Sequence, residues 1–487
     1  TTSRLIMTKG NDGKAARRRA TKQLLSLSCC VLVFTTCFLV FDGGNKNSSS
    51  SSSSAGNGSF SLSHNFPRRL GQRHRHGGPA AAGGSDVDES GMDAHELAVK
   101  YRRDLIQQFE DANEHDFLED VLNAKLHLIE VNGVEEELQR SPKNSYSGVY
   151  GSFCRLNFAL HKQNPSSVPM FRDIVAHSGC DDPFEVDLKK IAYLARQRDQ
   201  QVQESDDEQV PKVLNFTAAA FHESRCGSTL VANSMIAMDP AKHRAYSESA
   251  PPISAMKNVC GESFSLCSQE QAARILQDTI YLMSRTDDPQ EERVFFKFQS
   301  ITSTSIPTFQ MAFPQVPWMY VYRDPVQVMM SHVKDDPQLK RAICTRSMHG
   351  RPPRAIQAIA QRHGRNDSRE LKRAEYCASH LAMLTESAVN NLNDMAIPIN
   401  YDRLPSILWE EVMPKIFGRP LTTTEIENLE EISQQYSKGR GNKAGEFKGD
   451  SEQKEHAASN DIREAAKEFL QESFDALNKF KPKILMD

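Results

Sequence analysis

The segment 221–230, with the sequence FHESRCGSTL, combines residue types that can bind a phosphate group. The apolar run 213–221 leads into it and predicts a strand, and residues 229–238 follow with the pattern of a helix. A tight turn between a strand and a helix points backbone N–H groups at one spot, where the positive end of the helix dipole also lies. The segment lacks the G-x-x-x-x-G-K-S/T pattern of nucleoside triphosphatases, and its cation is Arg225, two residues before Gly227. These residues indicate a phosphate-bearing ligand other than ATP.

A second segment, 317–325 with the sequence PWMYVYRDP, reads as a buried strand that ends in a charged turn. Residues 326–331 continue with a helical pattern. Arg323 stands at the predicted strand end, and Ser331 follows eight residues later on the predicted helix. A guanidinium is always charged and makes bidentate contacts with phosphate, which favours a second phosphate site here. The structural alternative is a local ion pair between Arg323 and Asp324.

Together, the stretches RCGSTL and YRDPVQVMMS resemble the two donor-binding motifs of the sulfotransferase superfamily. The first resembles the loop for the 5′-phosphosulfate of the donor 3′-phosphoadenosine 5′-phosphosulfate (PAPS), and the second resembles the motif for its 3′-phosphate. The resemblance covers residues 213–401, and the motif layout is closest to the membrane-anchored Golgi branches that act on tyrosylproteins and carbohydrates. It implies an in-line displacement at sulfur, in which a hydroxyl or amine attacks the sulfuryl group of PAPS, and it implies no bound metal.

The resemblance assigns donor contacts to both motifs. In the first, backbone N–H groups, one cation and two hydroxyls would surround the 5′ end of PAPS; these residues are Arg225, Cys226, Gly227, Ser228 and Thr229. In the second, Arg323 and Ser331 would bind the 3′-phosphate, and a charge-assisted bond of this kind contributes about 1.5–3 kcal/mol. Serine and threonine are also favoured as helix caps, so a capping role for Ser228 and Thr229 is the structural alternative, and it is compatible with donor binding.

Two further residues are candidates for the chemistry itself. Lys297 lies among phenylalanines in the predicted strand 294–298, where the family, in particular its tyrosylprotein branch, carries a lysine that contacts the leaving-group oxygen. The alternative is an edge lysine that extends past aromatic rings to solvent. Glu248 follows the predicted strand 244–247, at a distance from the donor loop similar to that of a glutamate in the tyrosylprotein branch, and is the candidate general base. We expect burial and nearby donor anions to raise its pKa toward a useful value.

Three other side chains are weaker candidates. Many cytosolic members of the family use a histidine as the base, which leaves His222 and His332 in reserve. His222 stands next to the donor loop, where simple packing is the alternative. Tyr401 follows the predicted strand 397–401 at a place where the family has a tyrosine near the nucleotide.

The basic, glycine-rich segment 437–445 resembles a loop that cytosolic members close over the 3′-phosphate. Lys438 and Arg440 are therefore candidate donor ligands. The segment departs from the family pattern because Phe447 and Lys448 stand in place of the usual Trp-Lys ending, and a solvated loop is the alternative.

The N-terminal part of the chain has the composition of a membrane anchor and stem. Residues 1–23 are basic, residues 24–41 are apolar or small without charge, and residues 42–92 have the composition of a disordered segment. The positive-inside rule then places the N-terminus in the cytosol and the rest in the lumen. The resemblance to the Golgi branches implies a Golgi membrane protein. A cleaved signal peptide, followed by secretion, is the alternative. The formal charge of −4 for 487 residues argues against nucleic acid as a partner.

The cysteines favour the same compartment. Three lie in the apolar segment, namely Cys29, Cys30 and Cys37, and seven lie beyond it. Their spacing suggests three disulfides, with separate buried thiols as the alternative for each pair: Cys154 with Cys180, Cys260 with Cys267, and Cys344 with Cys377. Cys226 would remain free. Of four glycosylation sequons, those at Asn47, Asn57 and Asn366 lie in polar stretches, and Asn215 lies in a predicted core strand.

The rest of the chain divides into a helical region and an α/β domain. Residues 93–210 predict two helices, ended by Gly133, then a third over 184–198 and an acidic linker over 199–209; a stem that forms a homo-oligomer and a helical cap on the main domain are both open. Residues 211–482 alternate short apolar strands with helices, which predicts a P-loop-like parallel sheet with helices on both faces. The expected strands are 213–221, 244–247, 294–298, 318–322 and 397–401. Ligands of such sheets bind at the carboxyl ends of the strands, where both motifs stand.

The leading function is sulfuryl transfer from PAPS to a glycan, protein or lipid acceptor, and two alternatives remain. A P-loop kinase would need a Walker lysine, which is absent, and a magnesium-binding aspartate after a strand, for which Asp324 is the candidate. A luminal binding protein could keep the fold without the chemistry. The acceptor would contact loops such as 250–268 and 335–368, and the second loop is rich in arginine and histidine. That composition suits an acidic acceptor, and a solvated surface loop is the alternative.

Overall fold

The computed structural model describes residues 91–107, 112–204, 211–440, 445–446 and 448–483. These residues belong to one compact unit, 88–487. The predicted tail 1–23, anchor 24–41 and nearly all of the predicted stem 42–92 lie outside the described residues. Within the described ranges, no helix is both long and apolar enough to cross a membrane.

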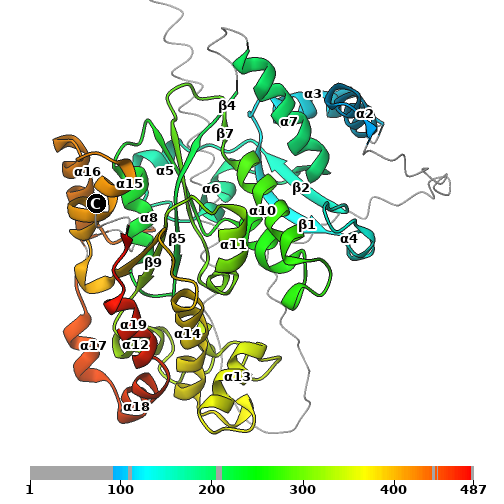
Figure 1. Cartoon of the computed structure of the whole chain (residues 1–487). Coiled ribbons are helices and arrows are strands. Elements are labelled where there is room, and N and C mark those ends of the chain that lie inside the picture. The colour runs from blue at the N-terminus through cyan, green and yellow to red at the C-terminus, as the bar shows by residue number, and fades with distance from the viewer. Residues whose placement is uncertain (1–90, 108–111, 205–210, 441–444, 447, 484–487) are drawn as a thin grey trace, which may run out of the picture. The chain divides into compact units, whose positions relative to one another are not determined.

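A parallel sheet of five strands forms the centre of the molecule (Figure 1). In spatial order the strands are β10 (Ala396–Asn400), β9 (Trp318–Tyr322), β5 (Asn215–His222), β8 (Arg293–Lys297) and β6 (His243–Ser247). Every neighbouring pair runs parallel. The predicted parallel sheet and all five predicted strands are confirmed, with ends that shift by one or two residues.

Helices cover both faces of this sheet because its strands are apolar on both sides. On β5, Phe221 packs toward α10 (Gln269–Met283) and α11 (Ile306–Ala312), whereas Ala220 packs toward α8 (Ser228–Ala237). Figure 1 shows α10 and α11 on one side of the sheet and α8, α15 (Met413–Phe417) and α16 (Thr423–Gln434) on the other. This two-sided cover leaves the carboxyl edge of the strands as the place where their loops can meet a ligand.

A second apolar core lies among helices beyond the carboxyl end of β9. It contains α12 (Pro325–Asp335), α13 (Arg354–Arg362), α14 (Arg373–Val389) and α18 (Asn460–Phe469). Two further C-terminal helices, α17 (Ser451–Ala457) and α19 (Gln471–Lys479), flank this group. This core fixes α12, the helix that carries Ser331 of the second predicted phosphate motif.

The sequence predicted a helical N-terminal region, but the structure shows that the region also contains strands. The helices α2 (Ala94–Ile106), α3 (Ala112–Leu122) and α7 (Leu188–Gln203) are present, but a three-stranded antiparallel sheet lies between them. Its strands are β1 (His127–Gly133), β2 (Val149–Cys154) and β3 (Phe184–Asp187). The predicted third helix, 184–198, is therefore wrong at its start, because its first four residues form β3. The predicted second helix is wrong after Leu122, because the chain turns at Ala124, with φ of 56°, and then pairs with β2. Smaller helices complete the region: α4 (Glu135–Arg140), α5 (Ala159–Gln163) and α6 (Phe171–Ser178).

The predicted acidic linker 199–209 is wrong at its start, since α7 runs to Gln203 and buries Asp199. The Asp199 carboxylate accepts hydrogen bonds from Arg285 Nε and Nη2, at 2.9 and 2.7 Å, and from the Tyr281 hydroxyl. Arg285 also donates to the carbonyl oxygens of Val121 and Leu122 at the end of α3. This buried network joins the N-terminal helices to the end of α10.

We expect Asp199→Asn to lower the free energy of unfolding by about 3–5 kcal/mol, because it leaves the Arg285 guanidinium buried without a countercharge. Urea denaturation of the two chains measures the difference. Asp394→Asn is the control: it removes a carboxylate that pairs with Lys483 on the surface, and we expect a change of about 0.5 kcal/mol or less. Equal losses in both variants would contradict the proposed importance of the buried pair.

The three predicted disulfides are present, and they join Cys154 to Cys180, Cys260 to Cys267, and Cys344 to Cys377. Cys226 is a free and buried thiol, also as predicted. Disulfides form and persist in oxidising compartments, so these three indicate such a compartment for the described part of the chain. Cys29, Cys30 and Cys37 lie outside the described residues.

Candidate active site

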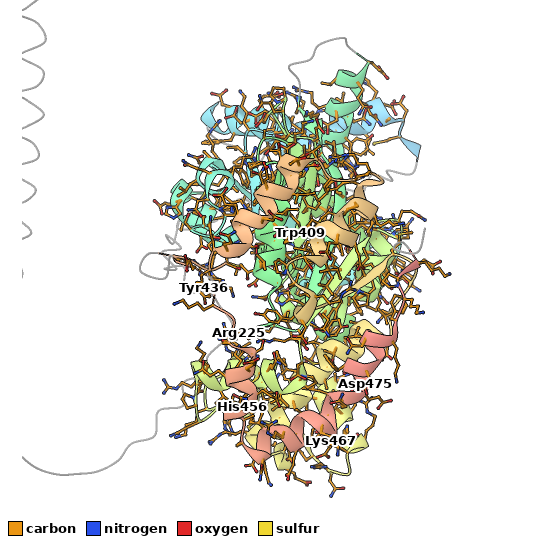
Figure 2. The ribbon with its side chains drawn as sticks, turned by 90° about the vertical axis from the view of Figure 1, so that its left-hand side faces the viewer. Arg225, Trp409, Tyr436, His456, Lys467 and Asp475 are labelled. Carbon is orange, nitrogen blue, oxygen red and sulfur yellow. A yellow bond between two sulfur atoms is a disulfide. The ribbon has the colours of Figure 1, made fainter. Side chains whose placement is uncertain are left out.

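The predicted site residues gather along the carboxyl edge of the central sheet, because each follows or ends one of its strands. In the spatial order of the strands, the edge carries Tyr401 after β10, Arg323 after β9, the loop 223–227 after β5, Lys297 at the end of β8 and Glu248 after β6. Adjacent strands lie about 4.8 Å apart, so β9 and β6 are separated by about 14 Å. Figure 2 shows Arg225 on this edge, between Tyr436 and His456 in that view. The edge therefore offers a row of polar groups long enough for an extended ligand.

The loop after β5 has the backbone of an anion-binding turn. Ser224, Arg225 and Gly227 have φ of 82°, 59° and 86°, all in the left-handed region, which turns successive N–H groups toward one side. Gly227 is the N-cap of α8 and makes no side-chain cap, so the predicted alternative of capping by Ser228 or Thr229 does not occur. The N-terminus of α8, with the positive end of its dipole, thus lies at this turn.

The tip of this loop also needs glycine for steric reasons. A Cβ atom on Gly227 would lie 2.8 Å from Cδ2 of the Tyr401 ring. The ring of Tyr401 also lies under the Arg323 guanidinium, whose Cζ is 3.9 Å from the ring centroid. Tyr401 thus separates and aligns the two predicted phosphate motifs.

Cys226 lies inside this loop but is no nucleophile. Its thiol donates to the carbonyl oxygen of Val321 at 3.0 Å, and burial raises its pKa to about 12. The thiol is therefore neutral at physiological pH. Cys226 contributes backbone and packing to the loop.

Lys297 and Glu248 form an ion pair between adjacent strand ends. The Lys297 side chain is only 1% exposed and that of Glu248 15%. Burial opposes ionisation of Glu248, but the charge of Lys297 lowers its pKa to about 2. The expectation of a raised pKa for Glu248 is wrong in this arrangement, because the sequence did not show that Lys297 pairs with it. Glu248 is ionised, yet it is a weak proton acceptor as long as Lys297 holds it.

His222 is engaged on both ring nitrogens. Nδ1 accepts from the N–H of Ser224 at 3.0 Å, so Nε2 carries the proton, which points at the carbonyl oxygen of Phe298 at 3.1 Å. Burial, followed by the charge of Lys297, holds its pKa well below the usual value. His222 therefore acts as a neutral support for the loop and offers no free nitrogen to a substrate.

Arg323 is buried and held from several sides. Its guanidinium donates to Gln327 Oε1 at 3.0 Å, to Ser451 Oγ at 2.8 Å and to Asp450 Oδ1 at 3.3 Å. The predicted alternative, an ion pair with Asp324, does not occur: Asp324 instead caps α12 by accepting the N–H of Gln327. The Arg323 charge thus faces the site and the C-terminal helices.

Ser331 lies on the same face of α12 as Gln327, one helical turn further on. Its hydroxyl donates to the carbonyl oxygen of Gln327 at 3.0 Å, and the side chain is buried. Gln327 therefore links Arg323 to Ser331, since residues four apart share a helix face. The eight-residue spacing seen in the sequence corresponds to this shared face.

Asp450 was not predicted, although it binds three cations of the site. Besides Arg323, it contacts Lys454 at 2.7 Å and Lys334 at 3.5 Å. Burial opposes ionisation of this carboxyl, but Lys454 and Arg323 lower its pKa. A carboxylate with three surrounding cations marks the place where a phosphate could bind with similar charge complementarity. No local sequence signal reveals Asp450, because it approaches Arg323 across 127 positions.

Glu223 is a second unpredicted residue at the same edge. It is buried at the start of the loop 223–227 and accepts the N–H of Arg323 at 2.6 Å. Burial raises its pKa well above the usual value. A buried acidic residue between an apolar strand and a glycine turn was a signal in the sequence, and it went unused. Glu223 joins the end of β5 to the end of β9.

Of the two basic candidates in the segment 437–445, the structure brings one to the site. Lys438 is near enough for the charges of Lys297 and Glu248 to act on it, and burial, followed by Lys297, lowers its pKa to about 8. Asn233 on α8 holds the adjacent residue by donating to the Ser437 carbonyl at 3.0 Å. Arg440 instead pairs with Asp173 on α6.

Taken together, the edge presents two groups of cations on either side of the loop after β5. One group centres on Arg323, and the other consists of Lys297 and Lys438, next to the carboxylate of Glu248. Across the described part of the chain, no three His, Cys, Asp or Glu side chains are placed to hold a metal ion.

No family model matches the sequence, and no curated protein gives a significant match. The fold is similar to solved sulfotransferase structures. The sulfotransferase domain of the Synechococcus PCC 7002 olefin synthase is 12% identical with a TM-score of 0.29, and the match covers 55% of this chain and 97% of that domain. A sulfotransferase from Mycobacterium avium is 11% identical with a TM-score of 0.29, over 66% and 88%. One from Mycobacterium tuberculosis H37Rv is 10% identical with a TM-score of 0.28, over 78% and 98%. At this distance, function is inferred from the side chains of the chain itself.

Proposed function

We propose that this chain transfers a sulfuryl group from PAPS to a hydroxyl or amine of an acceptor. The observation that carries the proposal is the order of groups along the sheet edge. Arg323 and Ser331 stand at one end, the loop 223–227 in the middle, and the Lys297–Glu248 pair at the other end. PAPS carries a 3′-phosphate, a 5′-phosphate and a terminal sulfuryl group in this order. Arg323 and Ser331 would bind the first, the loop 223–227 the second, and the Lys297–Glu248 pair would face the third.

The proposed reaction assigns a task to each part of this edge. The acceptor oxygen or nitrogen forms a bond to sulfur while the bond from sulfur to the 5′-phosphate oxygen breaks, and adenosine 3′,5′-bisphosphate leaves. Lys297 donates a hydrogen bond to that oxygen as it gains negative charge. Glu248 accepts the proton that the acceptor loses. Both tasks require the Lys297 ammonium to move from Glu248 to the donor, which also frees the carboxylate.

No observation favours a kinase. The loop after β5 has no Walker lysine, and Asp324, the candidate magnesium ligand, caps α12 instead. A binding protein without turnover is the other alternative, and a transfer assay separates it from an enzyme.

We further propose that the enzyme acts in the Golgi lumen and is anchored by residues 24–41. The three disulfides of the described part support an oxidising compartment. The charge asymmetry around the apolar segment supports a luminal orientation. Trimming of an N-glycan from Asn366 by a glycosidase after expression in a secretory host would test this orientation.

The donor site is tested by titrating the purified chain with adenosine 3′,5′-bisphosphate, and separately with ADP and magnesium, while its melting temperature is followed. We expect stabilisation by the bisphosphate only. Arg323→Ala should weaken bisphosphate binding about 10- to 100-fold, because it removes a charge-assisted bond to the 3′-phosphate. Stabilisation by ADP with magnesium that equals or exceeds that by the bisphosphate would sink the sulfotransferase proposal.

Asp450→Asn should have the opposite effect and strengthen bisphosphate binding several-fold, because it removes a carboxylate that competes with phosphate for Arg323. Glu452→Gln is the matched control. It removes the same charge two residues away on α17, where the side chain is exposed and no contact with Arg323 is present. If Asp450→Asn weakens the bisphosphate, the carboxylate supports the site and does not compete with the ligand.

Donor binding should weaken above about pH 8, because the pKa of Lys438 is lowered to about 8 by burial and by Lys297. The donor is an anion and favours the charged amine. Its affinity is therefore highest below that pKa and falls by up to about tenfold per pH unit above it. Bisphosphate titrations from pH 6.5 to 9.5 measure the slope. Lys438→Arg stays charged throughout this range and should flatten the slope, whereas an unchanged slope in this variant would exclude Lys438 as its cause.

A further inference from the structure

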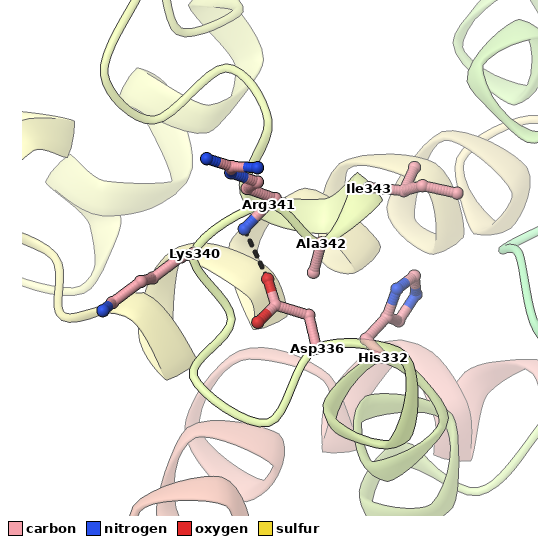
Figure 3. Close-up of a pocket in the computed structure, with 6 residues that line it drawn as sticks. All are labelled: His332, Asp336, Lys340, Arg341, Ala342 and Ile343. Atoms are coloured by element: carbon pink, nitrogen blue, oxygen red, sulfur yellow. Dashed lines mark hydrogen bonds between the residues drawn. The ribbon is translucent and has the colours of Figure 1, made fainter. Parts of the chain in front are cut away.

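A cavity of about 450 Å³ lies next to the C-terminal half of α12, beyond Ser331 (Figure 3). It is lined by His332, Asp336, Lys340, Arg341, Ala342 and Ile343. Residues 340–343 form one wall of the cavity. This segment is fixed in place, because Ala342 packs in the second core and Cys344 forms a disulfide with Cys377 on α14. The cavity is therefore a built feature of the fold.

The cavity lies close to the proposed donor site. His332 follows Ser331 directly on α12, and Figure 3 shows its ring directed toward Ala342 and Ile343 on the cavity side. The ring is 2% exposed, and its Nε2 has no hydrogen-bond partner among the described residues. An unpaired buried nitrogen is unfavourable, and a ligand hydroxyl would supply the missing partner once the ring turns into the cavity, since this nitrogen has almost no accessible surface in the structure. Burial, followed by the charge of Arg225, lowers the pKa of His332 to about 3, so the ring is neutral and suited to this contact.

The charges around the cavity are unbalanced. Lys340 and Arg341 are exposed, and neither has an ion pair with a described residue. The single acidic group of the lining, Asp336, already accepts the backbone N–H of Arg341. Further along the segment, Arg346, Arg351 and Arg354 also have no ion pair in the described part of the chain.

The next part of the chain shows that this imbalance is local. Arg362 pairs with Glu386, Arg365 with Glu375 and Glu468, and Arg369 with Asp367. The arginines of 362–369 thus balance their charge within the protein, whereas the basic residues of 340–354 do not. The segment 340–354 therefore differs from an ordinary solvated surface loop in three ways. Its basic residues lack acidic partners, it lines a cavity, and it lies beside a buried histidine with an unpaired nitrogen.

We propose that this cavity holds a charged unit of the acceptor, and that the acceptor is an acidic polysaccharide whose carboxylate or sulfate groups contact Lys340 and Arg341 while its reacting hydroxyl lies further along the edge, at Lys297 and Glu248. This inference rests on the proposed sulfuryl transfer. A hydroxyl-rich ligand fits because four of the six lining residues are polar or charged, and because no Phe, Tyr or Trp lines the cavity, as a phenolic acceptor would favour. The further arginines at 346, 351 and 354 follow at intervals, which suits a polymer with repeated negative charges.

The test measures binding of a heparin-derived hexasaccharide to the purified full chain, with a chemically desulfated and carboxyl-reduced hexasaccharide and poly-glutamate as the other two probes. We expect the acidic hexasaccharide to bind best. The double variant Lys340→Gln/Arg341→Gln should weaken it tenfold or more. The control Arg362→Gln/Arg369→Gln removes the same charge from the balanced part and should change binding by less than twofold. All four replaced side chains are exposed, so both variants should fold.

Ile343→Glu provides a second variant, since this side chain is half exposed at the cavity and the change adds a negative charge there. It should weaken the acidic hexasaccharide and leave the neutral one unaffected. Equal weakening in both double variants would overturn the inference, because it would show general attraction of a polyanion. Tighter binding of poly-glutamate, or no binding of the hexasaccharide, would overturn it as well.

Bisphosphate titration of the same samples separates this inference from the proposed function. Normal bisphosphate binding without hexasaccharide binding overturns the acceptor site alone. Loss of bisphosphate binding in the unmodified chain would remove the donor site and, with it, the premise of both proposals.

Discussion

Replacing Lys297 by glutamine should lower the turnover number for sulfuryl transfer about 10²- to 10³-fold. The proposed reaction places negative charge on the oxygen between sulfur and the 5′-phosphate, and the Lys297 ammonium stabilises it from a position that is only 1% exposed. In such a site a charge is poorly screened by water, so its loss is costly. Binding of the bisphosphate should change far less, because Arg323, Ser331 and the loop 223–227 remain.

The measurement is label transfer from PAPS to a mixed extract of glycans and secreted proteins, made with the donor at saturation. Lys190→Gln is the matched control, since Lys190 also pairs with a carboxylate, that of Asp104, but in the N-terminal region. We expect unchanged turnover in the control. A Lys297→Gln enzyme with full turnover would show that this lysine only balances the charge of Glu248.

The sequence predicted the parts of the fold that local patterns determine. Each core strand, such as 318–322, is a short apolar run of β-forming residues, and each was found where it was predicted. The turn 223–227 follows from glycine and small residues after such a run. The disulfide between Cys344 and Cys377 was suggested by spacing alone and is present.

Other features depend on contacts between distant segments, and the sequence did not show them. The strand His127–Gly133 continues the apolar pattern of the helix before it, and only pairing with Val149–Cys154 makes it a strand. Asp199 has acidic neighbours that suggested a linker, but its partner Arg285 lies 86 positions away. Asp450 lies 127 positions from Arg323 and has no motif of its own.

The ion pair between Glu248 and Lys297 also depends on a contact between distant segments. Glu248 and Lys297 are 49 positions apart, and they meet because β6 and β8 are neighbours in the sheet, an order that the sequence did not determine. The sequence therefore identified both residues and missed the effect of one on the pKa of the other. The pairing makes a proton acceptor and a leaving-group stabiliser mutually dependent, which two further experiments can detect.

The first of these experiments uses Glu248→Gln, which should lower turnover about 10²- to 10⁴-fold because the acceptor loses its proton to this carboxylate. The variant also leaves Lys297 buried without a countercharge, so some loss of stability is expected. Glu291→Gln is the matched control for that loss. Glu291 is a buried carboxylate that pairs with Arg244 and Lys162, and it lies just before β8, at the other end of that strand from Lys297. We expect the control to lose stability and to keep its turnover per folded molecule.

The second experiment is the pH profile, which separates a base from a structural partner. With Lys297 bound to it, Glu248 has a pKa of about 2. When Lys297 turns to the donor, burial is no longer offset, and the pKa of Glu248 rises. A base must be deprotonated, so activity is lost as the pH falls through its pKa. The acid limb of kcat, which reports the enzyme–substrate complex, should therefore lie at higher pH than that of kcat/KM. Lys297→Gln should move the limb of kcat/KM upward as well, since it removes the cation that lowers this pKa. If both limbs stay in place in that variant, another group accepts the proton and Glu248 serves only to position Lys297.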